Sequence, residues 1–401
     1  MMALMPVDEA LKRIVKTARL MPIEKIELSQ GMGRILAADI KAKRDQPPFA
    51  ASAMDGYALR CADCGAGTTK LKLIGVAAAG HGFKQALKQG QAVRILTGAP
   101  VPHGADTVVI QENTRVAGTV VEVLEAPILG KNIRAQGLDF LKADVLVPDK
   151  TKLGVRDIGL AAAGNGAIIR VRRKPRVVLF ATGDELVLPG AIARADQIYS
   201  SNSVALGAML ELWGAEVTNL GIVPDSMKAT KAAIAKARNA DMLVTTGGAS
   251  VGDHDYVQEA LKRSGIKIEF WKIALRPGKP LMFGTNGKLR VFGLPGNPVA
   301  ALVCARLFIK PLLDAMLGVP YTDEIVQARL LSSLPANDGR QDYLRATLIV
   351  ATDGQRSVQS FAKQDSSMQR NLRNADCLIL RRPNALAAEV GDVVPVLILD
   401  F

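Results

Sequence analysis

A glycine-rich segment in the middle of the chain has the composition of a phosphate-binding loop. The apolar run DMLVTT is followed by Gly247, Gly248 and Ser250, and Asp255 then leads into a helical pattern. Paired glycines let backbone N–H groups approach a phosphate closely, and the N-terminus of a following helix adds a favourable dipole. The segment has neither the Gly-Lys-Ser/Thr of a P-loop nor a GxGxxG fingerprint. We predict a phosphate cradle here, with a tight strand-to-helix turn as the alternative.

Acidic residues follow the apolar runs of the same region. The run VVLFA is followed by Thr182, Gly183 and Glu185, and the run AEVTNLGIV by Asp225. If these strands are neighbours in a parallel sheet, Glu185, Asp225 and Asp255 surround one crevice. Such carboxylates repel a phosphate unless a divalent cation lies between them, and Mg²⁺ prefers oxygen ligands. The prediction is a magnesium site, and the alternative for each acid alone is a helix cap or a solvated turn.

Three cations surround a Pro-Gly turn further along the chain. The segment WKIALRPGKP carries Lys272, Arg276 and Lys279, and the later segment GLPGNP carries Pro295 and Pro298. Cations beside a phosphate site neutralise charge that develops on phosphoryl or oxyanion oxygens. We therefore predict an anion-binding turn, and a solvated edge strand is the alternative.

The first half of the chain contains isolated polar and charged residues among small residues. Asp55 lies in SAMDGYA, Thr97 in TGAPVP, and Arg134 with Asp139 in RAQGLD. Small residues are expected where the backbone must close on a ligand. The sequence shows no arrangement of Ser, His and Asp or of Cys and His, so covalent nucleophilic catalysis is not indicated.

These residues need more than one kind of scaffold. Between Arg173 and about Pro320, strand-length apolar runs alternate with helical patterns, which indicates βαβ units around a parallel sheet. An amphipathic helix is predicted from Val7 to Arg19, and a long apolar helix from Pro298 to Met316. Short strands broken by turns predict a small β domain before this region and a β barrel or sandwich after it.

The predicted fold class is multidomain α/β and β, because 401 residues exceed what one core usually holds. Proline-rich and other changes of composition mark the boundaries. They give a discontinuous N-terminal domain of 1–43 and 142–172, a small β domain of 44–141, an α/β domain of 173–320 and a C-terminal β domain of 321–401.

The charge and composition narrow the class of partner. There are 51 basic and 38 acidic residues, a net charge of +13, which favours an anionic partner. Aromatic residues are only 4% and no dense basic run occurs, so we expect a small polyanion and no nucleic acid. No apolar run approaches the roughly 20 residues that cross a bilayer, and the first residues do not form a secretory signal. We expect a cytoplasmic protein that does not enter a membrane.

The four cysteines do not form a disulfide framework in a chain of this size. The segment CADC, with Cys61 and Cys64, has the spacing of half a zinc site or of a redox pair. A tetrahedral zinc site needs four ligands, and no second CxxC is present. Ordinary reduced thiols are the prediction.

Six motifs together resemble the molybdopterin molybdenumtransferase (MoeA) family, which includes the E domain of gephyrin. The motifs are SAMDGYA, ILTGAPVPHGADTVV, TGDEL, TTGGASVGDHDY, RPGKP and LPGNP, in the order and approximate spacing of the family. The resemblance covers essentially the whole chain. It implies a homodimer of elongated four-domain subunits, in which the third domain has the MogA/MoaB-like fold that binds molybdopterin and the fourth is a β barrel.

The resemblance also implies a reaction and a site. The family inserts molybdate into adenylylated molybdopterin and releases AMP with Mg²⁺, in a cleft between domain three of one subunit and domain two of the other. Implied partners are a second copy of the chain, the adenylyltransferase and molybdoenzyme chaperones. The residues carried over are Asp55, Thr97, Asp139, Asp225, Lys272, Arg276 and Lys279 for catalysis, Thr182, Gly183, Gly247, Gly248, Ser250, Pro295 and Pro298 for the pterin nucleotide, and Glu185 and Asp255 for the metal.

Two departures and two alternatives accompany this resemblance. Many members have Ser where this chain has Ala181, so a hydroxyl ligand is lost, and many have Lys where it has Arg276, whose planar fork binds anions differently. A non-catalytic scaffold like gephyrin is one alternative, against which the retained acidic motifs argue. A molybdopterin adenylyltransferase-like enzyme is the other, and it needs neither SAMDGYA nor a terminal β domain.

Overall fold

The computed structural model describes residues 4–247, 256–321 and 324–401. The chain forms two compact units, one of Lys25–Val171 and one that joins Met1–Glu24 to Arg172–Phe401. Within the described ranges, every helix is too short or too polar to cross a membrane.

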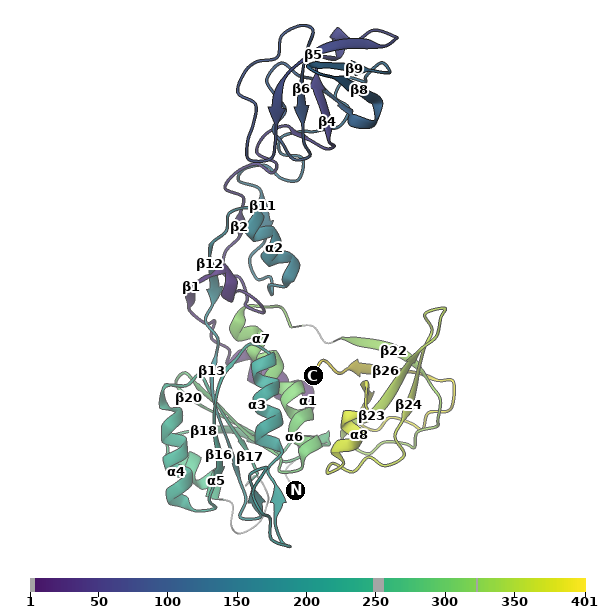
Figure 1. Ribbon diagram of the computed structural model, residues 1–401. Coiled ribbons are helices and arrows are strands. Elements are labelled where there is room, and N and C mark those ends of the chain that lie inside the picture. Colours follow the sequence, from purple (N-terminus) through teal and green to yellow (C-terminus); the bar gives the residue numbers. More distant parts are fainter. Residues whose placement is uncertain (1–3, 248–255, 322–323) are drawn as a thin grey trace. The chain divides into compact units, whose positions relative to one another are not determined.

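The unit Lys25–Val171 contains a six-stranded sheet of mixed direction (Figure 1). In pairing order its strands are β7 (Thr107–Ile110), β4 (Gly56–Leu59), β6 (Gln91–Ile95), β5 (Thr69–Ala77), β9 (Val120–Val123) and β8 (Thr114–Ala117). Successive side chains of a strand point to opposite faces, so Tyr57 and Leu59 pack in one apolar cluster and Ala58 in another. The predicted small β domain is present.

Short two-stranded pairs join segments that lie far apart in the sequence. The pairs are β1 (Ile23–Glu27) with β12 (Ile168–Arg172), β2 (Ile40–Lys41) with β11 (Val145–Val147), and β3 (Ala51–Ser52) with β10 (Ile133–Arg134). Helix α2 (Val155–Ala163) packs beside them, and Leu36, Val147 and Val171 share its apolar cluster. These pairs give the segments before and after the small β domain a common core.

The second unit contains an α/β part with a sheet of six strands. In pairing order they are β16 (Glu216–Val223), β13 (Arg176–Thr182), β17 (Met242–Thr246), β21 (Leu289–Leu294), β20 (Met282–Asn286) and β18 (Lys267–Trp271). The first four strands are parallel, as predicted, whereas β20 runs antiparallel to both of its neighbours, β21 and β18. After β13, the chain forms β16 on one side of β13 and then β17 on the other side of β13. The strand order therefore reverses between β13 and β17.

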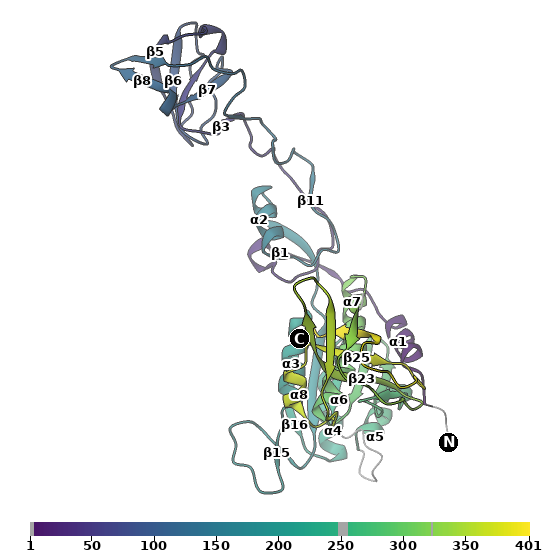
Figure 2. The ribbon, with the colours of Figure 1, turned by 90° about the vertical axis from the view of Figure 1, so that its right-hand side faces the viewer.

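Helices cover both faces of this sheet (Figure 1). One face carries α1 (Val7–Lys16), α3 (Asn202–Leu212), α6 (Pro298–Cys304) and α7 (Lys310–Leu317), and the other carries α4 (Met227–Lys236) and α5 (Tyr256–Arg263). Strand β13 is buried along six of its seven residues because both of its faces are covered. The strands β14 (Leu186–Val187) and β15 (Ile198–Tyr199) lie in a segment that projects from the sheet (Figure 2).

The C-terminal part is a closed β barrel, which decides between the predicted barrel and sandwich. Its strands are β22 (Ile325–Leu330), β23 (Gln341–Val350), β24 (Arg356–Ser360), β25 (Cys377–Arg381) and β26 (Val393–Ile398), with α8 (Gln369–Arg373) before β25. Pairing of β23 with β25 closes the ring. A short strand of the α/β part, β19 (Leu275–Arg276), pairs with β23 and joins the two parts.

Two predicted helices differ from those observed. The first ends at Lys16 and not at Arg19, because the Thr17 N–H and hydroxyl both bond to the Ile14 carbonyl and tighten the last turn. The helix predicted from Pro298 to Met316 is interrupted by a π-helical turn at Ala305–Ile309. Pro311 lacks the N–H that would continue the regular ladder, which accounts for the irregular turn before it.

Candidate active site

The carboxyl ends of the four parallel strands meet at one edge of the α/β sheet. Thr182 at the end of β13 pairs with Val223 of β16, and Thr246 of β17 pairs with Leu294 of β21. Because strand order reverses between β13 and β17, a crevice for a ligand is expected at their carboxyl ends. Thr182, Gly183 and Gly247 therefore lie together where a ligand is expected.

Backbone packing at this edge is close. Gly247 has a φ of +84°, and a Cβ on it would lie 2.1 Å from the Thr182 carbonyl oxygen, so only glycine fits. Thr182 is 2% exposed, and its hydroxyl has no hydrogen-bond partner among the described residues. A buried polar group without a partner is costly, so this hydroxyl is a candidate ligand group.

Asn202, at the start of α3, is a candidate site residue at this edge that sequence reasoning missed. Its Nδ2 donates to Thr246 Oγ1 at 2.9 Å and to the Gly296 carbonyl at 2.7 Å. The Thr246 hydroxyl in turn donates to the Pro295 carbonyl at 3.1 Å. Asn202 thus ties the ends of β17 and β21 together and fixes the segment that leads to Pro298, the first residue of α6.

The predicted magnesium ligands are only partly within the described chain. Glu185 is exposed, and its carboxylate lies where a side chain on Gly183 would be. Asp225 follows β16, and its N–H donates to Asp184 Oδ1 at 3.4 Å, so the acids after β13 and β16 are close together. Gly248, Ser250 and Asp255 lie outside the described residues. In the described ranges there is no group of three or more His, Cys, Asp or Glu side chains arranged to hold a metal.

The described cysteines are all free. Cys61 Sγ donates to the Pro127 carbonyl at 3.3 Å, and burial raises the pKa of the Cys64 thiol. Burial also raises the pKa of Cys304, and that of Cys377 to about 12. Raised values disfavour the thiolate that metal binding and nucleophilic attack require.

The three predicted cations of the turn before β20 have different surroundings. The Lys272 ammonium lies 4.3 Å from the centre of the Trp271 ring, and Lys279 is exposed. The Ile273 N–H donates to the Lys279 carbonyl at 3.0 Å, which closes the turn. Arg276 is engaged by the barrel: its Nη1 lies 3.1 Å from Asp342 Oδ2, and its Nη2 contacts Asp338. The structure therefore places Arg276 on two carboxylates.

A fourth cation, Arg345 on β23, is buried next to the loop before α6. It is 1% exposed, its Nη1 donates to the Asp365 carbonyl at 3.0 Å, and its Nε and Nη2 have no partner in the part of the chain described. The following residue, Ser366, accepts a hydrogen bond from Asn297 Nδ2 at 2.7 Å. Burial lowers the pKa of Arg345. An arginine in an alternating strand gives no signal of burial in the sequence, so this candidate anion-binding group was missed.

The unit Lys25–Val171 brings two predicted residues into direct contact. The N–H and the hydroxyl of Thr97 both donate to Asp55 Oδ1, each at 2.7 Å. The bond from the backbone N–H is the larger cause and the bond from the hydroxyl the next, and together they lower the pKa of Asp55. Asp55 is therefore a fixed, ionised and exposed carboxylate.

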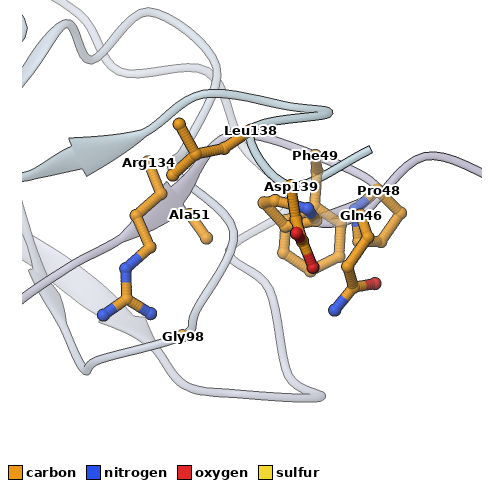
Figure 3. A pocket seen from close by; sticks show the side chains of 9 residues that line it. Gln46, Pro48, Phe49, Ala51, Gly98, Arg134, Leu138 and Asp139 are labelled. Carbon is orange, nitrogen blue, oxygen red and sulfur yellow. The ribbon is translucent and has the colours of Figure 1, made fainter. Parts of the chain in front are cut away.

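A pocket of about 400 Å³ lies in the same unit (Figure 3). Its lining includes Arg134, Asp139 and Gly98, the last of which follows Thr97. The Asp139 N–H donates to the Gln46 carbonyl at 2.9 Å, and Arg134 lies on β10 opposite Ala51 of β3. The pocket thus combines an exposed carboxylate with an exposed guanidinium.

Comparison with known proteins matches nearly the whole chain. The N-terminal region of MoeA (domains I and II) matches residues 5–164, a probable molybdopterin binding domain matches 178–315, and the C-terminal region of MoeA (domain IV) matches 327–399. A molybdopterin molybdenumtransferase of Haemophilus influenzae is 35% identical over an alignment of 384 residues, and the match covers 93% of each chain. One from a Nostoc species is 37% identical over an alignment of 335 residues, and the match covers 81% of this chain and 77% of the relative.

The fold leads to the same family. The crystal structure of a molybdopterin biosynthesis MoeA protein from Pyrococcus horikosii superposes with a TM-score of 0.84 at 29% identity, over 99% of each chain. The N-terminal and C-terminal regions both match, which disfavours the adenylyltransferase-like alternative, and the relatives are named as transferases, so the scaffold alternative is not favoured either. The chain belongs to the molybdopterin molybdenumtransferase (MoeA) family, as its motifs predicted.

Proposed function

We propose that this chain inserts molybdate into adenylylated molybdopterin and releases AMP, as a step of molybdenum cofactor biosynthesis. The observation that carries the proposal is the 35% identity, over 93% of both chains, with a relative named molybdopterin molybdenumtransferase. The crevice at the reversal of strand order supports it, since pterin nucleotides carry phosphates and such crevices bind ligands.

The pterin nucleotide would lie at the ends of β13 and β17. The buried Thr182 hydroxyl is available as a hydrogen-bond donor, and Gly183 and Gly247 leave room for close approach to the backbone. Pro295 and Pro298 would line the adjacent side through the loop that Asn202 holds. Gly248 and Ser250 would complete the cradle.

The described carboxylates fit a magnesium ion. Glu185 and Asp225 supply oxygen donors at one edge of the sheet, partly open to water, and Mg²⁺ keeps several waters beside one or two carboxylates. Asp255 would be the third. When bound, the ion would neutralise phosphate charge. The side chains of Glu185 and Asp225 would orient it, and the Thr182 hydroxyl would hold the phosphate by a hydrogen bond.

The cations would hold the oxyanion. Lys272 and Lys279 lie on one turn, and the buried Arg345 has donors with no partner among the described residues. Fixed donors aimed at oxyanion oxygens are worth most where water is excluded. Arg345, at 1% exposure, meets that condition, and the exposed Lys279 would serve for capture from solution.

The reaction itself is tested with purified protein, adenylylated molybdopterin, molybdate and Mg²⁺. AMP release is followed by chromatography, and transfer of the metal by reconstitution of a molybdoenzyme. Glu185→Gln and Asp225→Asn should each reduce AMP release at least tenfold, and Glu259→Gln, a carboxylate paired with Arg263 on α5, is the matched control. Full activity in both site variants would remove these residues from the site.

The residues of the unit Lys25–Val171 would act in the same reaction from a second copy of the chain. Asp55, whose carboxylate Thr97 fixes, and Asp139, which lines the pocket, would face the nucleotide. We propose a homodimer, in which mixing Asp55→Asn subunits with Glu185→Gln subunits restores one intact site in each mixed dimer. Mixed dimers, isolated by two affinity tags, that remain inactive would place both residues in one subunit.

A further inference from the structure

The guanidinium of Arg276 is held by two carboxylates of the barrel. Its Nη1 lies 3.1 Å from Asp342 Oδ2 and its Nη2 contacts Asp338 Oδ2. The pairing of β19 with β23 sets Arg276 directly opposite Asp342. Asp338 and Asp342 thus engage the two terminal nitrogens, the same donors that arginine offers to a tetrahedral oxyanion.

The two carboxylates differ in how firmly they are fixed. Asp342 belongs to β23, and its side chain is 7% exposed. Asp338 lies in the loop before β23 and its side chain is 49% exposed. Asp338 also has a second partner, because its Oδ2 lies 2.8 Å from Arg340 Nη2 and its Oδ1 accepts from the Arg340 N–H at 2.9 Å. Asp338 can therefore leave Arg276 and keep a cationic partner.

Space for an anion lies next to Arg276. A pocket of about 450 Å³ is lined by Arg276, Asp342 and Arg381, together with serine and amide side chains. The Arg276 side chain is itself 42% exposed, so an anion from solution can reach it. The hydrogen bond from the Arg340 side chain is the largest cause that lowers the pKa of Asp338, to about 2, so this carboxylate is ionised at neutral pH.

We propose that Asp338 is an internal oxyanion mimic, which occupies Arg276 until a tetrahedral oxyanion takes its place and Arg340 alone holds Asp338. The inference rests on the proposed function, in which the cations of this turn receive molybdate. Asp338 is then a specificity-determining residue: it sets how strongly an oxyanion must bind to displace it. Weak or singly charged anions are rejected by this competition, since they must overcome an existing ion pair.

Calorimetric titration of the full chain with sodium molybdate, and separately with sodium phosphate, tests the exchange at constant ionic strength. Asp338→Asn removes the competing charge and leaves the Arg276–Asp342 pair, so the Kd for the oxyanion should fall by about three- to tenfold. Asp338→Ala is a second variant with the same expectation. Glu259→Gln is the control, because it removes one arginine-paired carboxylate elsewhere and should leave the Kd unchanged.

A double-mutant cycle separates competition at Arg276 from a general effect of charge. If Asp338 acts through Arg276, Asp338→Asn no longer lowers the Kd for the oxyanion when Arg276 is also replaced by Gln. A lower Kd for molybdate or phosphate that requires Arg276 supports the proposal. The oxyanion whose Kd falls more in Asp338→Asn is the one that replaces Asp338 at Arg276. An unchanged or weaker Kd, or a gain that persists without Arg276, overturns it. Because no turnover is measured, failure of AMP release bears on the proposed function alone.

Discussion

Replacing Gly247 by alanine should destabilise the α/β part more than the same change at Gly265. The two glycines have nearly equal φ angles of +84° and +78°. They differ in the space around them: a Cβ on Gly247 would lie 2.1 Å from the Thr182 carbonyl oxygen, whereas the nearest atom to one on Gly265 is 3.5 Å away. The pair therefore separates the cost of backbone conformation from the cost of a clash.

The magnitudes follow from these distances. An alanine at positive φ costs about 1–2 kcal/mol, and that is the full expectation for Gly265→Ala. A carbon and a carbonyl oxygen approach to about 3.3 Å at closest, so Gly247 and Thr182 must separate by roughly 1 Å. They end strands that are buried and paired on both sides, where overpacking costs a further ~1–3 kcal/mol. Gly247→Ala should thus lose about 2–5 kcal/mol.

Urea unfolding followed by tryptophan fluorescence measures the difference. The chain has two tryptophans, Trp213 at the end of α3 and Trp271 on β18, so the signal reports on the α/β part. The midpoint should fall further for Gly247→Ala than for Gly265→Ala, with the same dependence on urea. Equal losses for the two variants would refute the reasoning, because they would mean that the ends of β13 and β17 separate at no cost.

Three further changes have defined outcomes. Asn202→Ala removes two hydrogen bonds of about 0.5–1.5 kcal/mol each, so the free energy of unfolding, measured with urea, should fall by about 1–3 kcal/mol. An unchanged free energy of unfolding would show that these two bonds do not stabilise the loops. Thr97→Val should raise the pKa of Asp55 toward its ordinary value of 3.8 in an NMR titration, and an unmoved pKa would contradict the hydroxyl's role. Because the pKa of Asp55 is lowered in the folded protein, its ionised form stabilises the fold above pH 3.8, and this stabilisation is lost as the pH falls through the native pKa. The free energy of unfolding of Thr97→Val should therefore fall less over this acidic range than that of the unchanged protein. Cys304, buried and with a raised pKa, should resist a thiol reagent until unfolding while the half-buried Cys61 reacts; equal rates would contradict that burial.

The arrangement of the α/β part could be predicted because its signals are local. Alternating strand and helix patterns indicate parallel strands, and parallel strands place the residues after them at one edge. Thr182, Asp225 and Gly247 could therefore be placed at this edge from their positions after apolar runs. The same reasoning predicts no partner for a side chain, because it says only where a strand ends.

The partners of Arg276 could not be predicted from the sequence, for a physical reason. Asp342 lies 66 residues away, and the contact exists because the two-residue strand β19 joins the barrel. Such a short pairing has no periodicity to detect. Arg345 was missed because arginine in an alternating strand predicts an outward side chain. Asn202 looks like a helix cap, yet its amide bonds across to two other segments.

The net charge of +13 does not measure the attraction that the turn before β20 exerts on an anion. At physiological salt, exposed charges act over about 8 Å, so lysines elsewhere on the chain contribute little there. Within that range, Arg276 is matched by Asp338 and Asp342, and the exposed Lys279 has no carboxylate partner among the residues that the structure describes. Loss of the Asp338 contact would free a guanidinium that is already placed, without any new cation. The local field therefore depends more on the position of one carboxylate than on the excess of basic residues over the whole chain.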